Sequence, residues 1–131
     1  MSRQAEAFRA AYEAFSRGDH DAALAAIDPE FEVRDRIIPE VVGKRGPAAL
    51  IENVRMVREV FGEVTYEPRE FVELDDAVLI RVHATVVGAA HTGLSFDMDI
   101  GQLWTLREGR AIALDIYRTW DEARAAAGLE D

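Results

Sequence analysis

The spacing of apolar residues changes once along this chain, at Gly62, from a helical period of about 3.6 residues to strict alternation with a period of two. Alternation predicts strands that bury one face, and the connections between the alternating runs are short. Short connections make consecutive strands antiparallel neighbours. We therefore expect four antiparallel strands in the second half of the chain, at residues 64–74, 77–87, 94–107 and 110–120.

The first half of the chain predicts helices. Apolar residues follow helical spacing from Arg3 to Arg17, and Gly18 is expected to end that helix. The remaining expected elements are a short helix between Asp19 and Pro29, a strand at 31–35, an irregular segment at 36–45, a helix opened by Gly46-Pro47, and a last helix between Asp121 and Gly128. Helices segregated from an antiparallel sheet describe an α+β domain.

Length and charge limit the class of protein. The 131 residues suffice for one core, so we expect a single domain over residues 1–131. A net charge of −10 disfavours binding to nucleic acid and to anionic membranes. No cysteine is present, the segment 1–14 lacks the apolar stretch of a secretory signal, and no apolar run is long enough to span a membrane. We expect a cytoplasmic location.

One polar residue, Gln102, interrupts an apolar strand face. The face contains Phe96, Met98, Ile100, Gln102, Trp104 and Leu106. A buried amide without a hydrogen-bond partner costs roughly 1–3 kcal/mol, so either the protein or a ligand must supply that partner. Gln102 therefore predicts a pocket.

Three segments resemble one protein family. They are GQLWTLREGRAIALDIYRTWDEARAAAGL at 101–129, YEAFSRGDHDAAL at 12–24 and FEVRD at 31–35. They are similar to SnoaL-like (polyketide cyclase-like) proteins of the nuclear transport factor two-like and ketosteroid isomerase-like superfamily. The resemblance implies a cone-shaped curved antiparallel sheet wrapped around three N-terminal helices, a short C-terminal helix and a pocket inside. Such relatives include cyclases, isomerases, epoxide hydrolases, dehydratases and binding modules, so fold alone does not choose a function.

Strand pairing predicts which side chains face that pocket. If the loop at 88–93 turns near its centre, Arg81 and His83 lie on the same face as Gln102, and a one-residue bulge at the turn 107–109 continues the face onto the last strand. The expected polar residues are Arg81, His83, Gln102 and Arg118, and the expected apolar or aromatic residues are Met98, Ile100, Trp104, Leu114 and Ile116.

The opposite face of the strand at 77–87 is more apolar, and this leaves an alternative open. It contains Val78, Ile80, Val82, Ala84 and Val86. The simplest pairing buries this face in the core and leaves Arg81 and His83 in water. A homodimer through the outer face of the sheet would reconcile two buried faces, and it is the expected assembly.

Ketosteroid isomerases imply roles for three residues. Asp35 ends FEVRD, where those enzymes place the general-base aspartate. Gln102 falls at the position of their oxyanion-hole acid, although an amide is a weaker donor, and Tyr12 lies within one residue of their tyrosine. Steroid isomerisation itself is therefore not expected. The structural alternatives are that Asp35 starts a turn or pairs with a neighbouring arginine, and that Tyr12 is a core aromatic.

His83 is the second candidate base, because imidazole titrates near neutral pH. Its alternative is a structural or exposed histidine. Arg81 and Arg118 would bind an enolate or carboxylate, or would pair with acids on the rim.

Limonene epoxide hydrolases have an Arg and an Asp at the positions of Arg81 and His83, and a second acid at the position of Ile116. Epoxide hydrolysis is disfavoured because both acids are missing.

No metal or cofactor is expected. Asp97, Asp99 and Asp115 occupy the other face of the hairpin formed by the last two expected strands, as solvated acids commonly do, and no histidine or cysteine has ligand spacing with them.

The sequence supports two functional hypotheses. In the first, the chain is a cofactor-free isomerase, cyclase or lyase that acts on a small hydrophobic carbonyl compound, polyketide-like or steroid-like, with Asp35 or His83 as base and Gln102 near the carbonyl oxygen. In the second, the same pocket serves a non-catalytic ligand-binding or dimerisation module.

Overall fold

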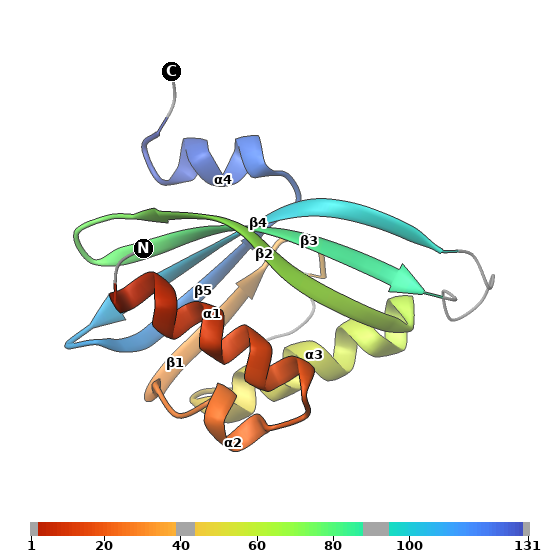
Figure 1. Ribbon diagram of the computed structural model, residues 1–131, viewed down its shortest axis with the longest axis horizontal. Helices are drawn as coiled ribbons and strands as arrows, with labels where there is room; N and C mark the ends of the chain where they lie inside the picture. The colour runs from red at the N-terminus through yellow and green to blue at the C-terminus, as the bar shows by residue number, and fades with distance from the viewer. Residues whose placement is uncertain (1–2, 39–43, 88–94, 130–131) are drawn as a thin grey trace.

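The computed structural model describes residues 3–38, 44–87 and 95–129, which form a curved, unclosed five-stranded sheet and four helices (Figure 1). The helices are α1 (Arg3–Ser16), α2 (His20–Ala23), α3 (Pro47–Phe61) and α4 (Trp120–Ala126). The strands are β1 (Ile27–Asp35), β2 (Glu63–Glu73), β3 (Ala77–Val87), β4 (Phe96–Arg107) and β5 (Arg110–Tyr117). None of the described helices has the length and apolar character needed to cross a membrane.

The sheet has the strand order β1-β5-β4-β3-β2. Strands β2 to β5 pair antiparallel with their chain neighbours, which confirms the prediction from their short connections. Strand β1 instead pairs parallel with β5. The expectation of an entirely antiparallel sheet is wrong at this edge, because β1 and β5 are far apart in the chain and no hairpin fixes their relative direction.

Several element ends differ from the sequence prediction. Strand β1 begins at Ile27, which pairs with Ala111, so α2 is only a single turn. Helix α4 is capped by Thr119 rather than by Asp121, because the Thr119 hydroxyl accepts a hydrogen bond from the amide of Glu122 at 3.1 Å. The predicted start of β4 at residue 94 and part of the predicted irregular segment, residues 39–43, lie outside the described residues.

The helices occupy both sides of the sheet (Figure 1). Helices α1 and α3 contact the concave side through β1 and β2, α2 packs on α1, and α4 packs on β4 from the other side. Gly101 permits this last contact, because a Cβ there would overlap the Cβ of Ala123. Two long helices lie over the sheet with one short turn beside them, so the expected arrangement of three N-terminal helices inside the sheet stays a prediction.

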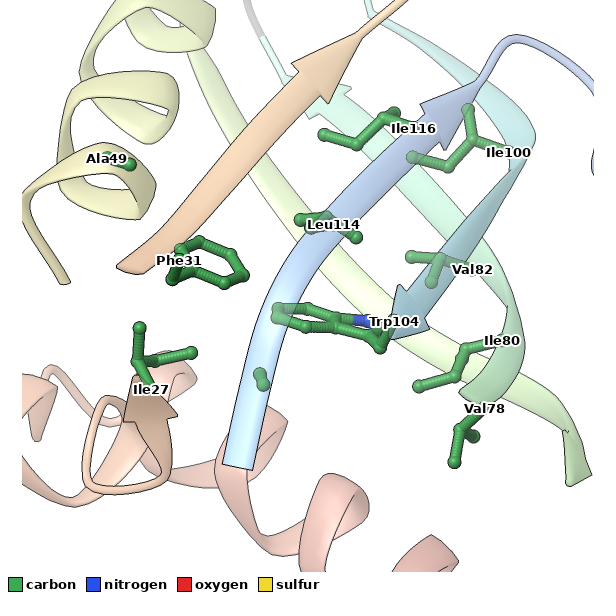
Figure 2. Close-up of a cluster of buried hydrophobic side chains, with 11 residues drawn as sticks. Ile27, Phe31, Ala49, Val78, Ile80, Val82, Ile100, Trp104, Leu114 and Ile116 are labelled. Carbon is green, nitrogen blue, oxygen red and sulfur yellow. The ribbon is translucent and has the colours of Figure 1, made fainter. Parts of the chain in front are cut away.

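The register between β3 and β4 overturns the predicted pairing of these strands. Ile80 lies opposite Gln102, and Val82 lies opposite Ile100, so the apolar side of β3 faces the core. Figure 2 shows Ile80 and Val82 on the same side of the sheet as Trp104. Arg81 and His83 consequently face outward. A slip of one residue in the connecting loop exchanges the two faces of a strand, and burying five apolar side chains is more favourable than burying two basic ones.

The register between β4 and β5 agrees with the prediction. Gln102 lies opposite Ile116, and Trp104 lies opposite Leu114. The expected one-residue bulge is present, although it lies within β5, between Ala111 and Ala113, rather than in the turn.

Candidate functional site

A cavity of about 200 Å³ lies between α1, α3 and the concave side of the sheet. Its wall is mostly apolar and includes the predicted residues Met98, Ile100, Trp104, Leu114 and Ile116. Several of these side chains can be followed in Figure 2. The polar side chains on the wall are Gln4, Tyr12, Asp35, Asn53, Tyr66 and Gln102.

Gln102 is 6 % exposed and is held by Tyr12. The Tyr12 hydroxyl donates a hydrogen bond to Gln102 Oε1, which joins α1 to β4 across the cavity wall. Among the described residues this is the one hydrogen bond of the Gln102 side chain, so its amide N–H groups remain available to a ligand. Burial raises the pKa of Tyr12, which keeps its hydroxyl protonated and able to donate.

Trp104 adds a third donor beside this pair. Its indole N–H is close enough to the Tyr12 hydroxyl to oppose the rise in the pKa of Tyr12. It nevertheless makes no hydrogen bond of normal geometry with any described residue, although the Nε1 atom is buried. Buried donors usually have partners, so this group is a candidate to meet a ligand oxygen.

Asp35 is 7 % exposed, and its carboxylate is held by three donors. Oδ1 accepts from the main-chain amides of Ile37 at 2.7 Å and Ile38 at 3.0 Å, and Oδ2 accepts from Nδ2 of Asn53 at 2.8 Å. The turn that follows β1 is therefore fastened by Asp35, and α3 supplies the donor that fixes its second oxygen. The alternative ion pair of Asp35 with Arg34 or Arg36 does not form, because both arginines bind Asp115.

Tyr66 stands near the same carboxylate. Burial, reinforced by the negative charge of Asp35, raises the pKa of Tyr66 to about 12, so its hydroxyl stays protonated. The sequence analysis missed both Tyr66 and Asn53. Asn53 carried a usable signal, since it interrupts the apolar stripe of α3 as Gln102 interrupts that of β4. Tyr66 carried a weaker one, because an aromatic residue on an alternating strand is ordinary.

Asp35 and Gln102 belong to one row across the sheet. Asp35 pairs with Ile116 on β5, and Ile116 pairs with Gln102 on β4. Two strand spacings of about 4.8 Å place the Cα atoms of Asp35 and Gln102 roughly 10 Å apart. All three side chains line the cavity, so a ligand resting on Ile116 would have a carboxylate at one end and an amide at the other.

Three predicted polar residues do not line the described cavity. His83 lies on the outer face between two carboxylates, with Nδ1 3.0 Å from Asp99 and Nε2 3.0 Å from Asp97. Arg81 lies 3.1 Å from Asp99 on that same face. The prediction that these two residues face the pocket is wrong, because it depended on the shifted register of β3. Arg118 follows the end of β5; its side chain is 67 % exposed and lies 3.4 Å from Glu122.

Asp115 is not the solvated acid that the alternation of acids suggested. It is 5 % exposed, and Arg34 binds both of its oxygens at 2.7 and 2.8 Å. Arg36 adds a contact at 3.1 Å. Burial alone would raise the pKa of Asp115, but these two guanidinium groups lower it below its usual range. The part of the chain that the structure describes contains no cluster of three or more His, Asp or Glu residues arranged to hold a metal ion.

Comparison with known proteins matches residues 8–114 to the SnoaL-like domain family. A nuclear transport factor two-like protein of unknown function from Burkholderia pseudomallei is 26 % identical, with 95 % of this chain and 97 % of that one covered and a TM-score of 0.75. TerC, co-crystallised with polyporic acid, is also 26 % identical, with 98 % of both chains covered and a TM-score of 0.75. A putative polyketide cyclase from Acidithiobacillus ferrooxidans is 20 % identical over 95 % of this chain and 96 % of that one, with a TM-score of 0.70, which is a likeness of fold alone. No curated protein matches.

Proposed function

The chain belongs to the SnoaL-like domain family, and we propose that it is a cofactor-free acid–base enzyme, an isomerase, cyclase or lyase that acts on a hydrophobic carbonyl compound. The mostly apolar cavity supports a hydrophobic ligand. Solved structures of similar fold include two described as putative polyketide cyclases, which supports a polyketide-like compound.

In the proposed reaction, Asp35 removes a proton from the carbon next to the carbonyl group. The electron pair of that C–H bond moves to form a carbon–carbon double bond, and the carbonyl oxygen becomes an enolate oxygen. The amide N–H of Gln102, whose Oε1 is held by the Tyr12 hydroxyl, donates a hydrogen bond to that oxygen. Asp35 then returns its proton to another carbon, so that an isomer forms and the protein is regenerated.

The placement of Asp35 and Gln102 in one row of the sheet carries this proposal. Both side chains are at least nine-tenths buried, and the apolar wall around them strengthens electrostatic interactions. Asn53 and two main-chain amides hold the carboxylate in a fixed orientation. A general base needs such an orientation, because it must approach one particular C–H bond.

The second candidate is a binding module with the same pocket. It is favoured by the three hydrogen bonds that satisfy the Asp35 carboxylate without any ligand, because such a carboxylate can serve only to close the turn after β1. Epoxide hydrolysis is not favoured, since Arg81 lies on the outer face and Ile116 provides no second acid.

A homodimer through the outer face of the sheet stays a prediction. The register places Arg81, His83 and Asp99 on that face, so such a dimer would be held by polar contacts rather than by the apolar ones first expected. Sedimentation equilibrium at micromolar concentration measures it directly, and dissociation by salt would distinguish the polar interface from an apolar one.

Proton exchange tests the enzyme without knowledge of its substrate. 2-Acetonaphthone is incubated with the protein in D₂O, and loss of its methyl proton signal is followed by NMR. We expect exchange faster than in buffer, and a rate reduced by about 100-fold or more in Asp35→Asn, in the range typical of a general base. Arg81→Gln is the matched control, since Arg81 lies on the outer face. Binding of the ketone without protein-dependent exchange would favour the binding module.

A further inference from the structure

We propose that the cavity accepts uncharged ligands and rejects anions such as carboxylates and phosphates. The inference rests on the proposed use of this cavity as a ligand site, but it does not require that the bound ligand reacts. It narrows the class of ligand to neutral compounds that carry a carbonyl or hydroxyl oxygen.

The charges on the wall support this restriction. Among the described residues that line the cavity, Asp35 is the one charged side chain, and no lysine, arginine or histidine accompanies it. The chain has 15 Lys and Arg residues, and none of the described ones lines the cavity. Arg34 binds Asp115 and Arg81 binds Asp99, both on the outer face. An anion that entered would lose its hydration and find no cation to replace it.

Asp35 would also repel an anion, because its carboxylate is buried in the same mostly apolar space. A cation is not required either. The carboxylate already accepts hydrogen bonds from the amides of Ile37 and Ile38 and from Asn53, so its charge is compensated before any ligand arrives. The described lining residues therefore offer no free counter-charge to an anionic or to a cationic ligand.

The donors at the other end of the row are neutral. They are the amide N–H groups of Gln102 and the buried indole N–H of Trp104, which have no hydrogen-bond partner of normal geometry among the described residues, while the Tyr12 hydroxyl holds Oε1 of Gln102. Neutral donors suit an uncharged carbonyl or hydroxyl oxygen, whereas proteins usually bind carboxylate and phosphate groups with arginine or lysine.

Two probes of equal skeleton test the proposal. 2-Acetonaphthone and 2-naphthoate share the naphthalene ring and differ in a neutral acetyl group against a carboxylate. Their dissociation constants are measured at neutral pH by calorimetry and by fluorescence of Trp104, which lines the cavity. We expect the ketone to bind at least about tenfold more tightly, a difference of about 1.4 kcal/mol. 2-Naphthylmethylammonium, a cation, should also bind more weakly than the ketone.

Two variants locate the cause of the selectivity. Asp35→Asn removes the negative charge and should raise the affinity for naphthoate relative to the ketone by about tenfold, and a cooperative urea transition reports that the variant is folded. Met98→Lys places a cation on the wall through a flexible side chain and should likewise favour naphthoate. Arg81→Gln, on the outer face, should change neither constant.

The outcomes separate this inference from the proposed reaction. Naphthoate or the ammonium probe binding as tightly as the ketone would overturn it, even if proton exchange proceeds. Binding of none of the three probes would overturn it as well. Selective binding of the ketone without proton exchange would uphold it and leave the protein as a binding module.

Discussion

Replacing Gly101 by alanine should push α4 away from the sheet. The size of this displacement follows from the contact between Gly101 and Ala123. The added Cβ would overlap the Cβ of Ala123, while the next nearest atoms, the Thr119 carbonyl oxygen and the Ala123 Cα, lie at 3.5 and 3.6 Å. A normal separation of two carbon atoms is about 3.5 Å, so α4 would have to move by about 1 Å. The contact is with buried backbone and a methyl group, which have no rotamer to change.

We expect Gly101→Ala to lower the free energy of unfolding by about 1–3 kcal/mol, the usual cost of overpacking. Ala123→Gly alone should cost about 1 kcal/mol through its helix propensity. The double variant moves the methyl group from the helix to the strand and should be no less stable than Ala123→Gly. Urea denaturation of the four proteins gives a coupling energy of at least about 1 kcal/mol in favour of the double variant.

Additive effects, within about 0.5 kcal/mol, would refute the reasoning, because they would mean that the two positions do not touch. Ligand binding provides the internal control. Gly101 faces α4 whereas Gln102 faces the cavity, so the double variant should bind 2-acetonaphthone with an unchanged dissociation constant.

The other predictions concern the site and the outer face. Asn53→Leu leaves Asp35 with one donor fewer and should lower the free energy of unfolding by about 1.5–3 kcal/mol in urea denaturation; an unchanged midpoint would contradict the contact. Tyr12→Phe removes the donor that holds Gln102 and should weaken binding of 2-acetonaphthone in calorimetry, whereas binding as tight as in the parent protein would show that this hydrogen bond does not position Gln102 for the ligand. Hydrogen bonding to Asp99 raises the pKa of His83, so its stabilising contribution is complete below the unfolded pKa of about 6.5 and is lost as pH rises through the raised folded value. The stability difference between the parent and His83→Gln should therefore shrink from mildly acidic to mildly alkaline pH, and a difference that grows would contradict the assigned contact.

Local patterns predicted the strands and one wall of the pocket. Alternation along β4 identified the face of Gln102. The two-residue turn at Glu108 and Gly109, both with positive φ, together with the one-residue bulge between Ala111 and Ala113, sets the register that places Leu114 and Ile116 beside it. These features depend on residues close together in the chain, so the sequence contains the information directly.

The face of β3 could not be settled in the same way. Its register depends on the centre of a longer connection, and a one-residue change there moves Arg81 and His83 from one side of the sheet to the other. The apolar alternation of β3 itself predicted the correct face, and a resemblance to relatives with two buried faces led away from it. Hydrophobic pattern was the better guide here, because burial energy acts on every residue of the strand.

The hydrogen-bond partners of Asp35 could not be predicted from neighbouring residues in the sequence, for a different reason. Its position at the end of a strand was evident, but Asn53 belongs to a helix 18 residues later, and the orientation of that helix depends on the whole sheet. The sequence alone therefore suggested a carboxylate at the pocket and could not reveal which groups hold it.

The parallel pairing of β1 with β5 also determines when the pocket can exist during folding. Arg34 and Asp115, which join these strands, are 81 positions apart, so the edge of the sheet closes only after nearly all of the chain has been made. Contacts of such long range form slowly, since a large loop must close first. The antiparallel strands β2 to β4 can pair with their chain neighbours locally. Asp35 is aligned with Gln102 only after β5 has paired with both β1 and β4. The carboxylate is thus among the last groups to arrive, and a nascent chain has no complete pocket before β5 has joined the sheet.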